Sequence, residues 1–429
     1  MRLLITLLVA LYGTVLPSVA SAQSGPRNCT PTSQNLFVRD VLDEYYLWYR
    51  ELPRLNPSQY ATPEAYLEAA RYRPLDSSFS YVTSRAANDA FYGDSQFVGL
   101  GISTQVDGTE MRVLQVFPDS PASEAGMARG DRIIEINGRT VVQLVESALI
   151  GGAFGASQPG VTAQLVFRSR DGLERRASLT KRVVTIPTVS LARTFRVDGR
   201  TVGYLMFRNF VKPSYAALDE AFAALREARA TELVIDLRYN GGGLVDVAVH
   251  LGSLVAGSLT EGRVFATFQH NDKNSALNED LRFMQASQPL NLSRLFVITT
   301  RASASASELL INSLRPHLPV HVIGEATYGK PVGQYGFPFC DKVLAPVAFS
   351  LVNSEGQGDF FDGIAPTCTA GDDVEHDLGD AAEASLAEAL HLMRTGRCSA
   401  EATAQRLQRL RVRGSPERAT GWQSLVNAH

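Results

Sequence analysis

Ser305 lies in a run of small residues that could expose a nucleophile. Residues 302–308 read ASASASE, and their small side chains leave the Ser305 hydroxyl unhindered. A helix is predicted to begin directly afterwards, so the free N–H groups of its first turn, such as that of Ala306, would face an oxyanion developing on a substrate carbonyl. Alternatives remain open, because Ser305 also fits a capping box with the glutamate three residues later, and Ser303 and Ser307 are rival nucleophiles.

Lys330 is the candidate base for that serine. A serine hydroxyl is a weak nucleophile until a base removes its proton. Lysine ordinarily has a pKa of about 10.4, so it can act as that base only where burial disfavours its charged form. Lys330 follows Ser305 by 25 residues and lies between Gly329 and Pro331. We expect folding to bury its amine within hydrogen-bond reach of the Ser305 hydroxyl; the alternative is a solvated surface lysine.

A glycine-rich loop is the third candidate element. Residues 236–243 read DLRYNGGG and follow a continuous apolar run of the kind found in buried strands. Three successive glycines permit unusual backbone angles and a close approach of another segment. Taken alone, the loop could equally be a flexible turn.

These three loops fall in a region, residues 188–398, that alternates strand and helix signals. Apolar runs predict buried strands at residues 202–207, 233–237 and 295–299, and helical segments are expected at 215–230, 244–255 and 307–314. This alternation indicates an α/β layer architecture. Residues 256–290 are polar and irregular, and we expect them to form a lid or excursion.

The preceding residues, 95–187, favour short strands. Strands are predicted at 111–117, 132–136 and 162–168, a capped short helix at 119–126, and a hairpin turn at Asn137–Gly138. Residues 31–92 look helical instead, with apolar positions at helical spacing in 35–49 and a capped start at Thr62.

The chain has the features of an exported protein. Residues 1–22 combine one positive charge, an apolar run and small residues before a cleavage site after Ala22, which is typical of a secretory signal. A membrane anchor is the alternative, although the apolar run is short for a span. We expect a soluble mature protein, in the periplasm or secreted, without stable membrane insertion.

Composition and motifs exclude some functions. The chain has 429 residues with 41 basic and 44 acidic side chains, a net charge of −3, which gives no support for nucleic-acid binding. It has no motif for a zinc site, and we expect neither a metal nor another cofactor.

Four cysteines predict disulfides in an oxidising compartment. They are Cys29, Cys340, Cys368 and Cys398, and they allow three pairings. We expect Cys340 with Cys368, which closes the shorter loop, and Cys29 with Cys398, which ties the ends of the folded region; buried thiols are the alternative.

Residues 95–187 resemble a PDZ domain. The resemblance rests on the Gly-Leu-Gly-Ile loop, on Ser-Pro-Ala-x-x-Ala-Gly from Ser120 to Gly126, and on Gly-Asp-x-Ile and Ile-Asn-Gly further on. It implies that the loop at Gly99, Leu100, Gly101 and Ile102 binds the terminal carboxylate of a peptide, which would add as a strand to a sheet edge.

The whole pattern resembles the carboxyl-terminal processing, or tail-specific, serine proteases, which combine a Ser–Lys dyad with an embedded PDZ domain. The shared motifs are Ser-Ala-Ser-Ala-Ser-Glu, the lysine loop (residues 324–334) with Gln334 four residues after Lys330, and Asp-Leu-Arg-x-Asn-x-Gly-Gly. The resemblance implies that Ser305 is the nucleophile, Lys330 the general base, Gln334 its positioning residue, and the N–H groups of Gly243 and Ala306 the oxyanion hole. Pro331 departs from the glycine that is usual there.

The resemblance also implies an organisation and a function. The fold class would be multidomain α+β, with a signal peptide at 1–22, a helical domain at 30–94, a β-barrel-like PDZ domain at 95–187, an α/β catalytic core of the ClpP and crotonase type at 188–398, and a tail at 399–429. The protein would be a serine endopeptidase that binds the C-terminal tails of protein substrates, with a homo-oligomer or an adaptor as further partners.

Two other functions remain open at this point. A Ser-His-Asp site using His250 or His317 is compatible with the spacing. A catalytically silent binding or scaffold protein on the same fold is the alternative from another class.

Overall fold

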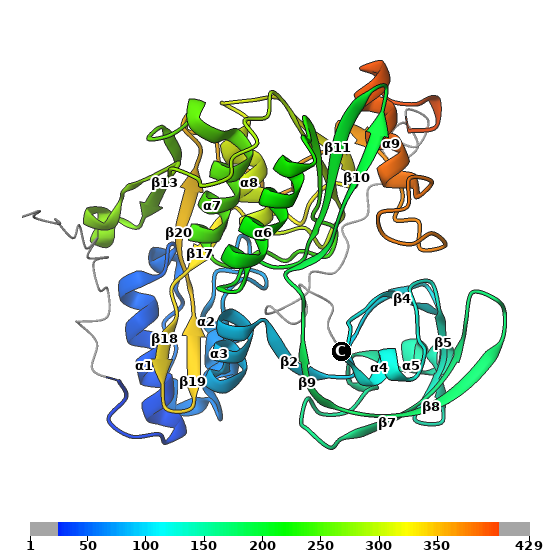
Figure 1. The fold of residues 1–429 in the computed structure, drawn as a ribbon. Coiled ribbons are helices and arrows are strands. Elements are labelled where there is room, and N and C mark those ends of the chain that lie inside the picture. The colour runs from blue at the N-terminus through cyan, green and yellow to red at the C-terminus, as the bar shows by residue number, and fades with distance from the viewer. Residues whose placement is uncertain (1–24, 403–429) are drawn as a thin grey trace, which may run out of the picture.

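The computed structural model describes residues 25–402 as a multidomain α+β protein (Figure 1). The predicted signal peptide and the predicted tail from residue 403 onward lie outside these residues. Within the described residues, no helix combines the length and the apolar character needed to cross a bilayer.

A six-stranded sheet forms the centre of the predicted catalytic region. Its order is β10-β11-β12-β15-β16-β21, antiparallel between β10 and β11 and parallel elsewhere. The strands are β10 (Val189–Val197), β11 (Arg200–Phe207), β12 (Glu232–Asp236), β15 (Leu295–Thr299), β16 (Val320–Gly324) and β21 (Cys368–Thr369). Because β12 and β15 are parallel neighbours, the loops after them meet at one edge of the sheet. These loops are the glycine-rich loop and the serine loop, residues 300–305.

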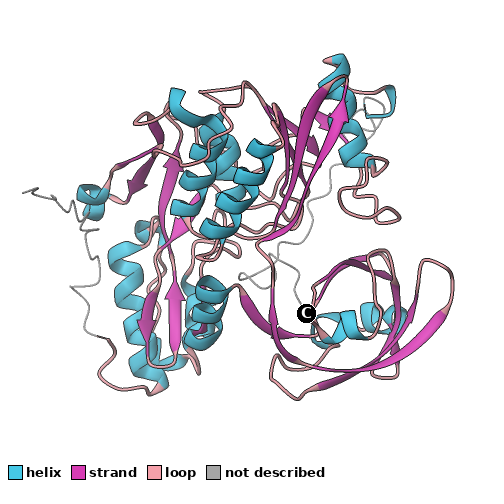
Figure 2. Ribbon diagram, viewed as in Figure 1, coloured by secondary structure: helices cyan, strands magenta, loops and turns pink. Residues whose placement is uncertain are grey.

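Both faces of this sheet are covered, as the continuous apolar strands require. Residues Leu233 and Ile235 of β12 pack with α6 (Ser214–Glu227), α7 (Val245–Ala256) and α8 (Ala306–Leu314), whereas Val234 packs on the opposite face with α9 (Ala384–Thr395). The predicted helices of this region are therefore confirmed to within a few residues, and Figure 2 shows them layered against the strands.

A second sheet carries the lysine loop. Its order is β14-β13-β20-β17, formed by β13 (Val264–His270), β14 (Asp280–Arg282), β17 (Val332–Gln334) and β20 (Val347–Val352). The interpretation of residues 256–290 as an irregular excursion is therefore wrong in part: β13 pairs with β20, whose residues lie about 80 positions later, a partnership that local polarity does not reveal.

The N-terminal region is helical but does not stand alone. It contains α1 (Pro31–Tyr45), α2 (Pro63–Ala70) and α3 (Arg85–Asp94), with short 3₁₀ turns at 49–51 and 57–59. Between α2 and α3, β1 (Tyr81–Ser84) pairs with β19 (Lys342–Ala345), which pairs with β18 (Phe337–Phe339). One sheet thus joins the N-terminal region to the segment just beyond the lysine loop.

The predicted PDZ region forms a separate sheet, β3-β4-β5-β7-β8, that lies to one side of the rest (Figure 1). Its elements are β3 (Ile102–Asp107), β4 (Glu110–Val116), α4 (Pro121–Glu124), β5 (Arg132–Ile136), β6 (Arg139–Thr140), α5 (Val141–Glu146), β7 (Thr162–Arg168) and β8 (Glu174–Thr180). The predicted Asn137–Gly138 turn joins β5 to β6, and both residues have positive φ.

A two-stranded ribbon connects this region to the catalytic region. It consists of β2 (Gln96–Gly99) and β9 (Arg182–Thr185), which pair antiparallel. At its base, the Ile186 N–H donates to the Ser95 carbonyl, and the Ser95 hydroxyl donates to the Ile186 carbonyl.

Arg129 holds the PDZ region against the core. Its buried guanidinium donates to the Tyr239 hydroxyl at 2.7 Å and to Asp372 at 2.7 Å. Tyr239 belongs to the glycine-rich loop, so the position of the PDZ region and that of the loop are physically linked.

The expected disulfide pairing is wrong. The bonds are Cys29–Cys340 and Cys368–Cys398. Cys340 lies at the turn between β18 and β19, and α1 packs on this hairpin, which brings Cys29 to it. Cys368 opens β21, and α9 packs back across the sheet so that Cys398 reaches the same edge.

Candidate active site

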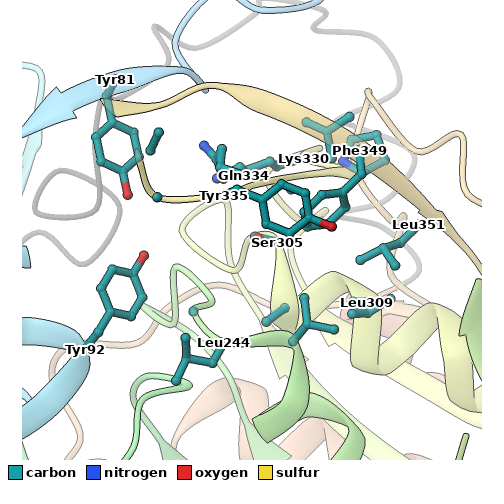
Figure 3. Close-up of a pocket in the computed structure, with 18 of the residues that line it drawn as sticks. Tyr81, Tyr92, Leu244, Ser305, Leu309, Lys330, Gln334, Tyr335, Phe349 and Leu351 are labelled. Carbon is teal, nitrogen blue, oxygen red and sulfur yellow. The ribbon is translucent and has the colours of Figure 1, made fainter. Parts of the chain in front are cut away.

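The predicted catalytic residues line one pocket of about 320 Å³ (Figure 3). Ser305 and Ala306 reach it from the start of α8, Gly243 from the glycine-rich loop, and Lys330 and Gln334 from the loop and strand of the second sheet. Side chains of Leu244, Leu309, Phe349 and Leu351 form an apolar wall near Ser305.

Ser305 has a backbone conformation that is unusual for a residue with a side chain. Its φ is 55° and its ψ is −113°, neither helical nor extended. Such outliers cost on the order of 1–3 kcal/mol and persist where the surroundings impose them, often at functional sites. The constraint is visible in the Glu308 carboxylate, which accepts the Ser305 N–H at 2.8 Å.

The two rival serines point into the interior. Ser303 donates to the Leu237 carbonyl at 2.8 Å, and Ser307 donates to the Asn240 carbonyl at 2.9 Å. Both are fully buried, and neither lines the pocket. Their hydroxyls fix the serine loop to the glycine-rich loop, so Ser305 is the serine of this run that can meet a substrate.

The glycines allow the two loops to pack directly together. A Cβ on Gly242 would lie 2.8 Å from both the Ala304 oxygen and the Ala306 nitrogen, and its φ of 98° is itself unfavourable for other residues. A Cβ on Gly243 would overlap the Phe210 carbonyl. Among residues 25–402, the N–H groups of Gly243 and Ala306 have no hydrogen-bond acceptor, which leaves both available at the pocket.

Lys330 is buried, as expected. Its exposed fraction is 7%, and burial lowers its pKa to about 8, although the negative charges of Asp76 and Glu308 oppose that shift. A sizeable fraction of the amine is therefore neutral near physiological pH, which a general base requires.

The Lys330 amine and the Ser305 hydroxyl line the same pocket, but the expected hydrogen bond between them is not among those of the described residues. Catalytic hydrogen bonds in substrate-free enzymes are often long and tighten when substrate binds. Gln334 does not contact Lys330 by a hydrogen bond either: its Nε2 donates to the Phe79 carbonyl at 2.6 Å. The Lys330 amine lies 6.0 Å from the centre of the Phe79 ring, so Phe79 is a residue that Gln334 and Lys330 both approach.

Glu308 is a site residue whose role the sequence did not reveal. Its fully buried carboxylate accepts the N–H groups of Ser305, Gly329 at 2.7 Å and Lys330 at 2.9 Å, and the Thr327 hydroxyl. Burial raises its pKa, and these hydrogen bonds oppose the shift. One side chain thus joins the backbones of the serine and lysine loops. The capping-box motif showed only its bond to Ser305.

The histidines considered for a triad lie elsewhere. His250 is 2.9 Å from Asp219, and His317 is 3.1 Å from the Val264 carbonyl. Neither lines the pocket with Ser305.

The predicted carboxylate-binding loop lies where β2 passes into β3. Gly101 has a φ of 85°, and a Cβ there would overlap Ser120. The Leu100 and Ile102 side chains are fully buried in the core of the PDZ region, so the backbone is what the loop presents. Strand β3 is an edge strand of its sheet, which leaves one side open to an added strand.

Family models match three parts of the chain. Residues 201–370 match peptidase family S41, residues 33–81 the peptidase S41 N-terminal domain, and residues 112–150 a PDZ domain.

Curated relatives are processing proteases of bacteria. The chain is 27% identical over 275 residues to a carboxy-terminal-processing protease of Bartonella bacilliformis, covering 61% of this chain and 60% of the relative. It is also 27% identical over 257 residues to the carboxy-terminal processing protease CtpB of Bacillus subtilis, covering 58% of this chain and 50% of the relative. The match thus spans half to three fifths of these relatives.

Solved structures agree on the fold. A crystal structure assigned to an S41 protease of Bacteroides fragilis has a TM-score of 0.67 and 27% identity, covering 83% of this chain and 96% of that one. The photosystem II D1 C-terminal processing protease, at 22% identity and a TM-score of 0.50, covers 79% of this chain and 93% of that one and bears on the fold alone. The three matched segments coincide with the catalytic, N-terminal and PDZ regions of this fold. The chain therefore belongs to peptidase family S41 and carries a PDZ domain.

Proposed function

We propose that this chain is an exported serine endopeptidase that cleaves protein substrates with Ser305 as nucleophile and Lys330 as general base. The observation that carries the proposal is a buried lysine amine with a pKa of about 8 in the same pocket as a serine held in a strained conformation. A binding protein has no chemical need for either feature.

The reaction follows from these groups. Neutral Lys330 takes the Ser305 proton as the oxygen attacks the substrate carbonyl, and the N–H groups of Gly243 and Ala306 bind the oxyanion. The Lys330 ammonium then protonates the leaving amine, which gives an acyl-enzyme. Water, deprotonated by the same amine, hydrolyses the ester and restores the serine. The apolar wall beside Ser305 favours an apolar side chain on the acyl side of the cleaved bond.

The PDZ region would select the substrate. We propose that backbone N–H groups at Gly99 to Ile102 bind the terminal carboxylate of a protein tail, which pairs with the free edge of β3. Peptides with a free C-terminus should bind, and the same peptides with a C-terminal amide should not. Equal affinity for both, measured by fluorescence anisotropy, would remove the carboxylate from the recognition.

Hydrolysis of an unfolded protein tests the catalytic assignment. Wild type and Ser303→Ala should cleave it, whereas Ser305→Ala, Lys330→Ala and Lys330→Arg should not, because a guanidinium stays protonated. A fluorophosphonate probe should label wild type at Ser305 but should react slowly with Lys330→Ala. Cleavage by Ser305→Ala at the wild-type rate would refute the proposal. If the wild type binds protein tails but never cleaves them, the protein would be a binding or scaffold protein without catalytic activity.

A further inference from the structure

A turn of the N-terminal region closes over the lysine. The turn, residues 76–80, reaches the lysine loop and its strand at three points. The Ser78 and Tyr328 hydroxyls are 3.2 Å apart, Gln334 donates to the Phe79 carbonyl, and the Val347 N–H of β20 donates to the Ser80 hydroxyl at 2.9 Å. The centre of the Phe79 ring lies 6.0 Å from the Lys330 amine, so this turn lies beside the amine.

Asp76 is the charged residue of this turn. It is fully buried and accepts four hydrogen bonds: the Tyr46 hydroxyl at 2.9 Å, the N–H groups of Phe79 and Ser80 at 2.9 Å each, and the Ser80 hydroxyl at 2.5 Å. An ionised carboxylate only accepts hydrogen bonds, so four donors match the charged form. No cation forms a salt bridge with it among the described residues.

The field of this carboxylate acts on the lysine amine. Besides burial, Asp76 has the largest influence on the pKa of Lys330, and it raises that pKa; Glu308 is the second charge that acts in the same direction. Glu308 belongs to α8, while β17 and β20 carry no ionisable side chain. Glu308 also binds the backbone of Lys330, so it cannot be changed without moving the loop.

We propose that Asp76 sets the base strength of Lys330, so that the N-terminal region supplies a positioning residue of the catalytic site. The proposal rests on the proposed function, in which Lys330 is the general base. Burial alone would leave the amine easy to deprotonate but weakly basic. The nearby negative charge restores basicity, and a stronger base takes the serine proton more readily in the transition state.

The test is the pH dependence of kcat and kcat/KM for hydrolysis of a peptide substrate by wild type and Asp76→Asn. Without the charge, the amine loses its proton at lower pH, so the acidic limb of both profiles should move down by about one pH unit. The plateau at high pH should also fall several-fold, because the base is weaker. The wild-type and Asp76→Asn profiles should therefore approach each other or cross at low pH. A lower amount of folded enzyme would instead reduce the rate by the same factor at every pH.

Tyr46→Phe is the matched control, because it removes one donor from the same buried cluster and keeps the charge. The acidic limb of its pH profile should stay at the wild-type pH. The pH at the midpoint of the acidic limb does not depend on the folded fraction as long as that fraction is the same at every pH, which circular dichroism across the pH range checks. If Asp76→Asn does not fold, Asp76→Ser replaces it, since a serine oxygen can accept the same turn N–H groups.

The role of Asp76 would be refuted if the acidic limb of Asp76→Asn or Asp76→Ser stayed at the wild-type pH, or if Tyr46→Phe shifted the limb by the same amount. Failure of the proposed function would look different from failure of the Asp76 proposal, because Lys330→Ala would then remain active whatever the Asp76 variants do.

Discussion

Replacing Glu308 with glutamine should weaken the hydrogen bonds that hold the serine loop against the lysine loop. One carboxylate oxygen accepts the Thr327 hydroxyl and the Gly329 N–H, and the other accepts the N–H groups of Ser305 and Lys330. A glutamine has one oxygen and one NH₂ group, so in either orientation at least one buried backbone N–H loses its acceptor.

The expected magnitude follows from these bonds. Each buried donor left without an acceptor costs about 1–3 kcal/mol, and bonds to a neutral oxygen are weaker than bonds to a carboxylate. We therefore expect Glu308→Gln to lower the free energy of unfolding by about 2–5 kcal/mol, a large part of the roughly 5–15 kcal/mol that stabilises a typical domain. A displacement of about 1 Å between reacting groups can reduce the rate by roughly 100-fold.

Urea unfolding and steady-state hydrolysis measure the two effects. Because the lost negative charge also changes the ionisation of Lys330, kcat should be compared well above pH 8, where the amine is neutral in both proteins and the weaker base alone lowers kcat only several-fold. Glu227→Gln, at an exposed position near the end of α6, is the control. If Glu308→Gln unfolds at the same urea concentration as this control and keeps its kcat, the carboxylate does not hold the site together.

Three further outcomes are expected. Gly242→Ala should abolish most activity, by about 100-fold or more in kcat, because its Cβ would displace the loop that carries Ser305; an active variant in a single-turnover assay would contradict this. Arg129→Ala should destabilise the protein by about 3–5 kcal/mol in thermal unfolding, because it breaks a buried ion pair and the hydrogen bond to Tyr239. It should also speed proteolytic cleavage of the β2–β9 ribbon, and an unchanged cleavage rate would show that the Arg129 contact does not hold the PDZ region in place. The wild-type kcat/KM should rise with pH through about pH 8 as Lys330 loses its proton, and a flat profile between pH 6 and 9 would exclude this amine as the base.

Local patterns predicted residues that the structure brings together in one pocket, because each of the three loops is a short, continuous motif. The glycine-rich and serine loops each follow a buried apolar strand, and neighbouring parallel strands bring such loops to one edge of a sheet. The close packing expected of the glycines is confirmed at Gly242 and Gly243.

Other features depend on partners far away in the sequence, and there the predictions were incomplete or wrong. The polar segment that contains β13 finds its partner in β20, and Cys29 finds Cys340 across 311 positions, through packing of α1 on a hairpin. Asp76 lies in a region for which the sequence predicted only helices, and its nearness to Lys330 arises from the sheet that joins β1 to β19. No local pattern carries such information.

The ribbon of β2 and β9 makes the PDZ region an insertion with adjoining entry and exit points. Ser95 and Ile186 are already hydrogen-bonded to each other, so the surrounding chain would form a continuous surface if the 90 or so residues between them were replaced by a tight turn. The PDZ region can therefore be exchanged, lengthened or reoriented about a single pair of strands, and a different binding domain can be attached to this peptidase fold without rebuilding it.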